Sequence, residues 1–146
     1  MPPARRIGEV SRKEHWQPDP EPHDYPAAAD YLSILLPPKT AEELVNRLKD
    51  APLSHRKAKD LLRASRLALL PAKDPEVVRD LKKVDRGERL SPVLLIRGDL
   101  TTDAPLTVAD GYHRICASYH LNEDEDIACR IADWPVRPRA AKQPSA

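Results

Sequence analysis

Four consecutive apolar residues, Val93 to Ile96, constrain the fold more than any other stretch of the chain. They follow Pro92, end before Gly98 and Asp99, and do not alternate with polar residues. A strand with one face in water would alternate, so this pattern is typical of a strand covered on both faces. The sequence therefore predicts a central strand inside a packed domain.

Three helices are expected ahead of this strand, over about residues 41 to 50, 54 to 65 and 75 to 84. Thr40 and Glu43 have the spacing of a capping box at the start of the first helix. Asp74 followed by Pro75 is typical of a helix start, and Gly87 is typical of the residue just past a helix end. Apolar residues recur at helical spacing in each segment, which indicates that each helix buries one face.

The chain after the central strand is expected to form a loop, two more strands and a helix. Residues 101 to 105 have the composition of a loop, residues 106 to 109 that of a second strand and residues 127 to 131 that of a third. Between the last two strands, apolar residues at helical spacing predict a helix from about Gly111 to Leu121. The predicted fold class is therefore α+β, with N-terminal helices followed by strand, strand, helix and strand.

Proline is concentrated at the two ends of the chain. Residues 1 to 38 are therefore expected to be extended or partly disordered, and residues 134 to 146 to form a disordered basic, proline-rich tail. Tyr25 and Leu32 make the first segment more apolar than a solvated tail needs, so we expect it to pack across the domain or against a partner. Residues 39 to 133 remain as one α+β domain, because the chain has room for one core.

Charge and cysteine content exclude several classes of protein. The 24 basic and 23 acidic side chains give a net charge of +1, so no overall field holds the molecule on nucleic acid or an anionic membrane. The sequence contains no apolar run of the length that crosses a bilayer and no secretion signal, which predicts a cytoplasmic protein with no membrane partner. Cys116 and Cys129 lack the spacing of a redox or zinc motif, so we expect two buried, reduced thiols.

Asp110 to Arg114 occupy the point where the second predicted strand meets the following helix. A glycine at such a turn permits close approach of the backbone, and the first free amides of a helix carry a partial positive charge. His113 and Arg114 add hydrogen-bond donors, and arginine offers a planar fork for two oxygens. The pattern predicts an anion site at Gly111, His113 and Arg114, with phosphate as its natural occupant.

A purely structural turn would explain the same residues. Asp110 would then cap the helix and pair with Arg114, while Tyr112 and His113 pack against neighbouring elements. Asp110 matters to this choice, because a carboxylate next to a phosphate repels it unless a metal ion bridges the two. Asp110 is therefore the candidate ligand of a bridging Mg²⁺ and, with His113, the candidate proton-transfer group.

Residues 75 to 132 resemble the core of the ParB/sulfiredoxin superfamily. In that family a strand leads into a G-x-[HR]-R-x-x-A turn that opens a helix, and Gly111, His113, Arg114 and Ala117 match this pattern. Members use the turn to hold nucleotide phosphates: CTP in chromosome-partitioning proteins, ATP in sulfiredoxins and an adenine nucleotide in a related free-serine kinase. The resemblance thus implies a bacterial protein that binds ATP or CTP with Mg²⁺.

Two departures narrow what the resemblance implies. Sulfiredoxin chemistry needs a cysteine immediately before the His-Arg pair, where this chain has Tyr112, and Cys116 lies one helical turn farther on. Partitioning proteins carry a DNA-reading domain after this unit, and the short segment after Ile131 cannot build one. We expect neither activity, and Tyr112 stays a candidate for stacking on a nucleotide base.

Two further charged segments are candidates for a role near the turn. Family members described as ParB-like nucleases would need a metal site or proton-transfer pair, and residues 123 to 126 offer carboxylates to add to Asp110 and His113. A solvated turn explains this acidic run more simply. Lys57 and Lys59, in the basic second helix, are candidate phosphate contacts, against the simpler alternative of a charged solvent face.

These observations leave two hypotheses. In the first, a nucleotide-binding domain holds phosphates at the 110–114 turn, and any turnover is phosphoryl transfer or nucleotide hydrolysis. In the second, a non-catalytic protein binds another protein, or nucleic acid more weakly, through its N-terminal segment and basic helix. Replacing Arg114 by alanine would separate them, since only the first hypothesis predicts loss of nucleotide binding with retention of the fold.

Overall fold

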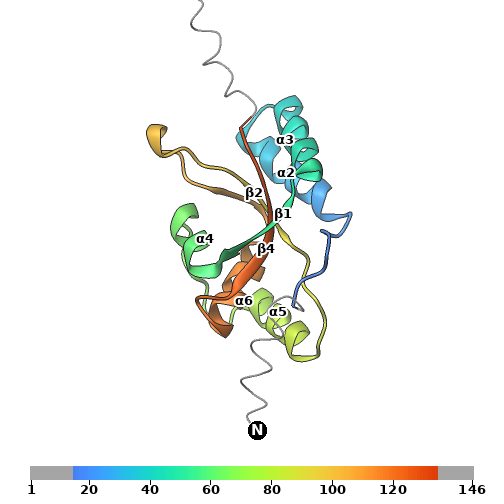
Figure 1. Ribbon diagram of the computed structural model, residues 1–146, viewed down its shortest axis with the longest axis vertical. Coiled ribbons are helices and arrows are strands. Elements are labelled where there is room, and N and C mark those ends of the chain that lie inside the picture. Colours follow the sequence, from blue (N-terminus) through green and yellow to red (C-terminus); the bar gives the residue numbers. More distant parts are fainter. Residues whose placement is uncertain (1–14, 135–146) are drawn as a thin grey trace, which may run out of the picture.

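The computed structural model describes residues 15 to 134, which form a four-stranded mixed sheet with helices on both faces (Figure 1). The strands are β1 (Leu53–Lys57), β2 (Val93–Ile96), β3 (Thr107–Asp110) and β4 (Asp126–Ala132). The helices are α2 (Asp24–Leu35), α3 (Pro38–Asp50), α4 (Ala58–Ser65), α5 (Pro75–Asp85) and α6 (Tyr112–Leu121), and the short 3-10 helix η1 (Leu100–Thr102) lies between β2 and β3. The α+β class is as predicted.

Strand β2 lies inside the sheet, whose strand order is β1-β4-β2-β3. It runs parallel to β4 and antiparallel to β3, and β4 runs antiparallel to β1. A parallel pair needs a long connection, which β3 and α6 supply between β2 and β4. All four residues of β2 are buried, which confirms the central strand.

Each face of β2 belongs to a separate hydrophobic core. Val93 and Leu95 pack with buried residues of α4, α5 and α6, whereas Leu94 and Ile96 pack with those of α2 and α3. Figure 1 shows α2 and α3 together at one side of the sheet. Because successive side chains of a strand point to opposite faces, an apolar run without alternation requires two such cores.

The N-terminal boundary of α5 is confirmed, and its C-terminal end lies within one residue of the prediction. Oδ1 of Asp74 accepts hydrogen bonds from the amides of Glu76, at 2.9 Å, and Val77, at 3.2 Å, and Pro75 opens the helix. Gly87 follows the end of the helix with a φ of +82°, which glycine adopts without steric cost. These signals are local in sequence, which is why the pattern located them.

The predicted start of α3 is wrong. The helix begins at Pro38 rather than near residue 41, and its N-cap is Pro37, which has no side-chain hydrogen bond to offer. Thr40 and Glu43 therefore lie inside the helix and do not form the expected capping box. Proline favours the first helical position because its fixed φ suits a helix and its missing amide has no partner there.

The predicted helix over residues 54 to 65 is wrong in its first part, because the chain forms β1 before α4 begins at Ala58. The backbone of β1 pairs with that of β4 along its whole length. As an edge strand it leaves three basic side chains exposed, those of His55, Arg56 and Lys57. The basic residues of β1 give no indication in the sequence that this segment pairs with β4, about 70 residues farther along the chain.

Residues 24 to 35 form α2 and not the extended or partly disordered segment that the prolines suggest. Pro26 lies in the first turn, where a missing amide costs no intrahelical hydrogen bond. Ala28 and Leu32 are buried in the core that α2 shares with α3, so the expected packing across the domain is confirmed. The predictions of disorder for residues 1 to 14 and 135 to 146 fall outside the described residues.

The two cysteines are free and buried, as predicted. Burial raises the pKa of the Cys116 thiol and of the Cys129 thiol. The Cys116 side chain packs from α6 into the core, with its sulfur 3.5 Å from the amide nitrogen of Leu70. A buried thiol with a raised pKa is a poor nucleophile.

Candidate functional site

The turn between β3 and α6 lies at the end of the sheet where β2 begins. Asp110 closes β3 opposite Leu94, and α6 begins at Tyr112 after the N-cap residue Gly111. Among residues 15 to 134, no side chain accepts a hydrogen bond from the first amides of α6. Open amides at a helix start are the electrostatic condition for binding an anion.

Gly111 is required by the packing of this turn. Its φ is +112°, and a Cβ built on it would lie 2.4 Å from Cγ1 of Val93 and 3.0 Å from Nη2 of Arg114. Val93 is fully buried, so it has little room to move away. The glycine therefore admits the Val93 side chain, and its presence is explained without a ligand.

The guanidinium group of Arg114 faces two carboxylates. Its Nη2 lies 2.8 Å from Oδ2 of Asp110 and 3.7 Å from Oδ2 of Asp24, and the Arg114 side chain is only 18% exposed. The pairing of Asp110 with Arg114 is confirmed. The prediction that Asp110 caps the helix is wrong, because Gly111 is the N-cap residue and makes no side-chain bond.

Asp24, on α2, is a member of this site that the sequence did not reveal. Its Oδ2 accepts a hydrogen bond from the Ser91 hydroxyl, and the same hydroxyl oxygen accepts one from the amide of Glu21 at 3.0 Å. Nε2 of His23 lies 3.3 Å from Oδ1 of Asp24. These contacts hold α2 against the turn. The sequence did not reveal Asp24 as a site residue because a single aspartate in a proline-rich segment matches no motif.

Asp80, on α5, is a third acidic group close to the turn and is only 8% exposed. Burial raises the pKa of Asp80, and the nearby positive charge of Arg114 only partly offsets the rise. The pKa of Asp110 is raised by burial in the same way, again with a partial offset from Arg114. The turn therefore combines one arginine with three aspartates, two of which bind protons more tightly than exposed aspartates do.

Tyr112 and His113 differ in how far the fold already engages them. The Tyr112 hydroxyl donates a hydrogen bond to the carbonyl oxygen of Ala68 at 2.5 Å, which ties the turn to the segment before α5. The two rings lie 5.5 Å apart between centroids. The His113 side chain makes no hydrogen bond or ion pair with any of the described residues, so its imidazole is available to a ligand.

Lys57 and Lys59 are not brought to the turn. The strand order places β4 and β2 between β1 and β3, a separation of about 14 Å at the usual spacing of strands. The amino groups of Lys57 and Lys59 lie 4.0 and 2.7 Å from Oδ1 of Asp124 instead. The hydrogen bond with Asp124 raises the pKa of Lys59 and lowers that of Asp124.

The acidic run from residue 123 to 126 also lies away from the turn. It follows the C-terminal end of α6, and the ten residues of that helix separate it from Asp110 by about 15 Å. Glu125 is buried beside His15, at 3.3 Å between Oε2 and Nδ1. Within residues 15 to 134, no three His, Cys, Asp or Glu side chains are grouped so that they could hold a metal ion.

No protein-family model matches the chain, and neither a curated protein nor a solved structure matches it. The resemblance to the ParB/sulfiredoxin superfamily therefore stays a prediction from the residues quoted above. None of the helices within residues 15 to 134 has the length and apolar character needed to cross a membrane.

Proposed function

We propose that the turn between β3 and α6 binds the phosphate group of a nucleotide, with ATP and CTP as the candidates that the family resemblance implies. We propose with it that the chain is a cytoplasmic, bacterial member of the ParB/sulfiredoxin superfamily. The observation that carries the proposal is the start of α6, where no side chain of the described residues caps the helix and Arg114 lies in the first turn.

In this proposal two kinds of group bind the phosphate. The first are the backbone amides at the start of α6, beginning with those of Gly111 and Tyr112, and the second are the side chains of His113 and Arg114. Arginine has five N–H donors, so Arg114 can keep its bond to Asp110 and still donate to a phosphate oxygen. Its Nε is buried without a hydrogen-bond partner among residues 15 to 134, which leaves donor capacity unused.

Three carboxylates, those of Asp24, Asp80 and Asp110, repel a bare phosphate at this turn. A Mg²⁺ ion that arrives with the nucleotide would offset the repulsion, with Asp110 as its candidate ligand. Protonation has the same effect, and the raised pKa values of Asp80 and Asp110 make it easier as the pH falls. Binding is therefore expected to strengthen with Mg²⁺ and, in the absence of Mg²⁺, to strengthen as the pH falls.

The same groups define the chemistry open to the site. Arg114 and the helix amides would stabilise negative charge on a transferring phosphoryl group. Asp110, with its raised pKa, and His113 are the candidates for proton transfer. The corresponding reaction class is phosphoryl transfer or nucleotide hydrolysis.

Isothermal titration calorimetry with ATP and CTP, each with and without Mg²⁺, tests the proposal. We expect Mg²⁺-dependent binding of one nucleotide, weakened at least about tenfold in Arg114→Ala, the loss expected when one charge-assisted contact is removed. Arg79→Ala is the matched control, because Arg79 is an exposed arginine of α5 that pairs with Glu76 at 2.8 Å.

Arg114→Ala also takes a partner from Asp110, so His113→Gln serves as a second variant that leaves this ion pair in place. Both proteins are first checked for cooperative unfolding. Unchanged affinity in both variants would exclude the turn as the nucleotide site.

A second candidate function is favoured by the outer face of α2. Tyr31, Ile34 and Leu35 are 45%, 80% and 54% exposed, an apolar surface on a helix whose other face is already packed. This surface suits a protein partner better than nucleic acid. Sedimentation velocity over a range of concentrations tests a second copy as that partner: Ile34→Asp should abolish self-association and the exposed control Ser33→Asp should not.

A further inference from the structure

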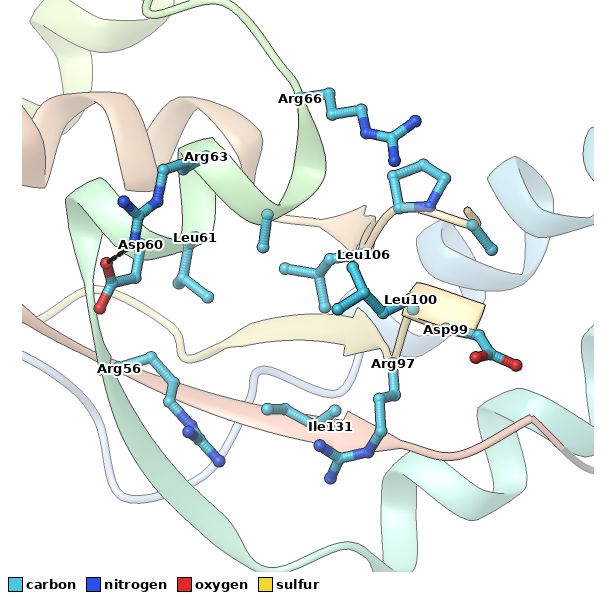
Figure 2. A pocket seen from close by; sticks show the side chains of 14 residues that line it. Arg56, Asp60, Leu61, Arg63, Arg66, Arg97, Asp99, Leu100, Leu106 and Ile131 are labelled. Carbon is cyan, nitrogen blue, oxygen red and sulfur yellow. Dashed lines mark hydrogen bonds and ion pairs between the residues drawn. The ribbon is translucent and has the colours of Figure 1, made fainter. Parts of the chain in front are cut away.

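A cavity of about 510 Å³ lies at the other end of β2, bounded by the sheet, α4 and the loop that contains η1 (Figure 2). Four arginines line it: Arg56 of β1, Arg63 of α4, Arg66 just after α4 and Arg97 just after β2. The volume lies in the range of about 300 to 1,000 Å³ that small-molecule sites occupy. Only the fold brings these residues together, because no local motif contains them.

The floor of the cavity is apolar. Figure 2 shows the side chains of Leu61, Leu106 and Ile131 in its centre, with Arg56 and Arg97 on either side of Ile131. Leu100, from η1, contributes a side chain that is 93% exposed at the rim. A ligand seated here would meet a hydrophobic surface below and guanidinium groups around its edge.

Three of the arginines form ion pairs in which both side chains are half or more exposed: Arg63 with Asp60, Arg66 with Asp103 and Arg97 with Asp133. Asp60 lines the cavity beside Arg63, whereas Asp103 and Asp133 are not among its lining residues. Exposed pairs of this kind contribute about 0 to 1 kcal/mol, so an anion can compete for the guanidinium groups. The guanidinium group of Arg56 has no hydrogen bond or ion pair with any residue from 15 to 134.

The helix ends beside the cavity have left-handed backbone conformations. Within the described part of the chain, Arg66 and Asp103 are the two residues other than glycine with positive φ, at +61° and +63°. They are joined by an ion pair of 2.5 Å between Nη2 and Oδ1. Arg66 and Asp103 are the C-cap residues of α4 and η1, and the left-handed conformation commonly ends a helix, so they fix the course of the chain beside the cavity.

This cavity is separate from the turn at the start of α6. Gly111 of the turn packs on Val93, the first residue of β2, whereas Arg97 follows the last. Four residues of strand span about 13 Å, which is too far for one phosphate group to contact both places.

We propose that this arginine-lined cavity binds a small molecule that carries a phosphate group on an apolar body. Arginine forks pair with oxyanions through two hydrogen bonds, and a phosphate, with three terminal oxygens, can accept from arginines on two sides at once. A carboxylate has two oxygens and one unit of charge, so it accepts fewer hydrogen bonds from the surrounding arginines than a phosphate does. The apolar floor covers the body of the ligand, and the proposal is independent of nucleotide binding at the turn.

Nuclear magnetic resonance of the full chain labelled with ¹⁵N-glycine tests the proposal. The chain has four glycines, so each site has its own reporter: Gly98 lines the cavity, Gly111 forms the turn and Gly87, after α5, belongs to neither. We titrate 1-naphthyl phosphate, 1-naphthoate and inorganic phosphate. We expect a saturable shift of the Gly98 signal with 1-naphthyl phosphate and at least about tenfold weaker binding of the other two.

Variants then identify the groups responsible. Arg56→Gln and Arg97→Gln should each weaken 1-naphthyl phosphate at least about fivefold, about one kcal/mol, whereas the control Arg79→Gln removes the same charge from α5 and should not. Unmoved Gly87 and Gly111 signals confirm that each variant is folded.

Four outcomes would overturn the proposal. A Gly98 signal that does not respond excludes the cavity, and a shift confined to Gly111 assigns the ligand to the turn. Equal binding of 1-naphthoate or of inorganic phosphate contradicts the proposed ligand class. Equal weakening in Arg79→Gln would show that only overall charge matters.

Discussion

The two ends of β2 use arginine in opposite ways. At its start, Arg114 is largely buried and faces Asp110 and Asp24, so a phosphate bound there would share its guanidinium group with two carboxylates of the fold. At its end, Arg97 and the other cavity arginines are exposed, and the three that have acidic partners form exposed ion pairs. The difference teaches that the burial of an ion pair decides how readily an anion can displace the acidic partner of the arginine.

The comparison extends to what each end contributes to stability. A charge pair shielded from water is strongly coupled to the fold, because loss of one partner leaves the other charge poorly solvated. An exposed pair contributes little and is screened by salt. Substitutions at the turn are therefore expected to change mainly the stability of the protein. Substitutions in the cavity are expected to change mainly the affinity for a ligand.

The largest expected effect on stability is that of Gly111→Ala. The added methyl group would collide with Val93 and the backbone would be strained at a φ of +112°, so we expect a loss of about 3 kcal/mol in the free energy of unfolding. Gly87→Ala is the matched control: its φ is +82° but nothing lies within 4 Å of the new Cβ, so about 1 kcal/mol is expected. Urea unfolding measures both, and equal losses would show that Val93 does not restrict the turn.

Arg114→Ala should have the next largest effect. We expect a loss of about 2 kcal/mol, below the usual cost of breaking a fully buried pair because the Arg114 side chain is 18% exposed. Arg97→Ala removes an arginine from the exposed end and should cost no more than about 1 kcal/mol. The comparison between the two ends fails if urea unfolding gives the two variants the same stability.

Asp80→Asn should produce a smaller effect that depends on pH. Burial raises the pKa of Asp80 in the folded state, so the native protein binds this proton more tightly than the unfolded chain. The associated stability is present at low pH and is lost as the pH rises through the raised pKa. Relative to the wild type, Asp80→Asn should therefore become more stable as the pH rises from about 4, near the ordinary aspartate pKa, towards neutrality.

The control for this effect is Asp85→Asn, which removes an exposed carboxylate from the same helix. Thermal unfolding at several pH values measures both variants. A stability difference between Asp80→Asn and the wild type that does not change with pH would show that burial of Asp80 is not what perturbs its proton affinity.

The smallest effect is expected for Lys59→Ala. The Lys59 amino group is exposed and pairs with Asp124 at the edge of the sheet opposite the turn. We expect no measurable change in melting temperature and no change in nucleotide affinity at the turn, in contrast to Arg114→Ala. A loss of nucleotide affinity in Lys59→Ala, measured by calorimetry, would restore this lysine as a phosphate contact.

The elements that the sequence predicted well have signals within a few residues of one another. Asp74 and Pro75 start α5 because the capping bonds reach only two and three residues ahead. The predictions for β1 and α2 are wrong because the contacts that stabilise these elements come from other parts of the chain. Strand β4 supplies the hydrogen bonds of β1, and helix α3 supplies the packing of α2. The candidate turn was predicted as a motif, but its acidic neighbours Asp24 and Asp80 were not.

The sequence by itself determined the central strand, the α5 boundaries, the strand-glycine-helix turn and the two buried thiols, because each depends on residue type and short-range spacing. Only the tertiary structure decided which charges meet. It placed Asp24 beside Arg114, took Lys57 and Lys59 to the opposite edge, and gathered arginines from β1, α4 and the end of β2 around one cavity. Coulombic attraction depends on distance and burial rather than on order along the chain, so a list of charged residues does not specify their partners.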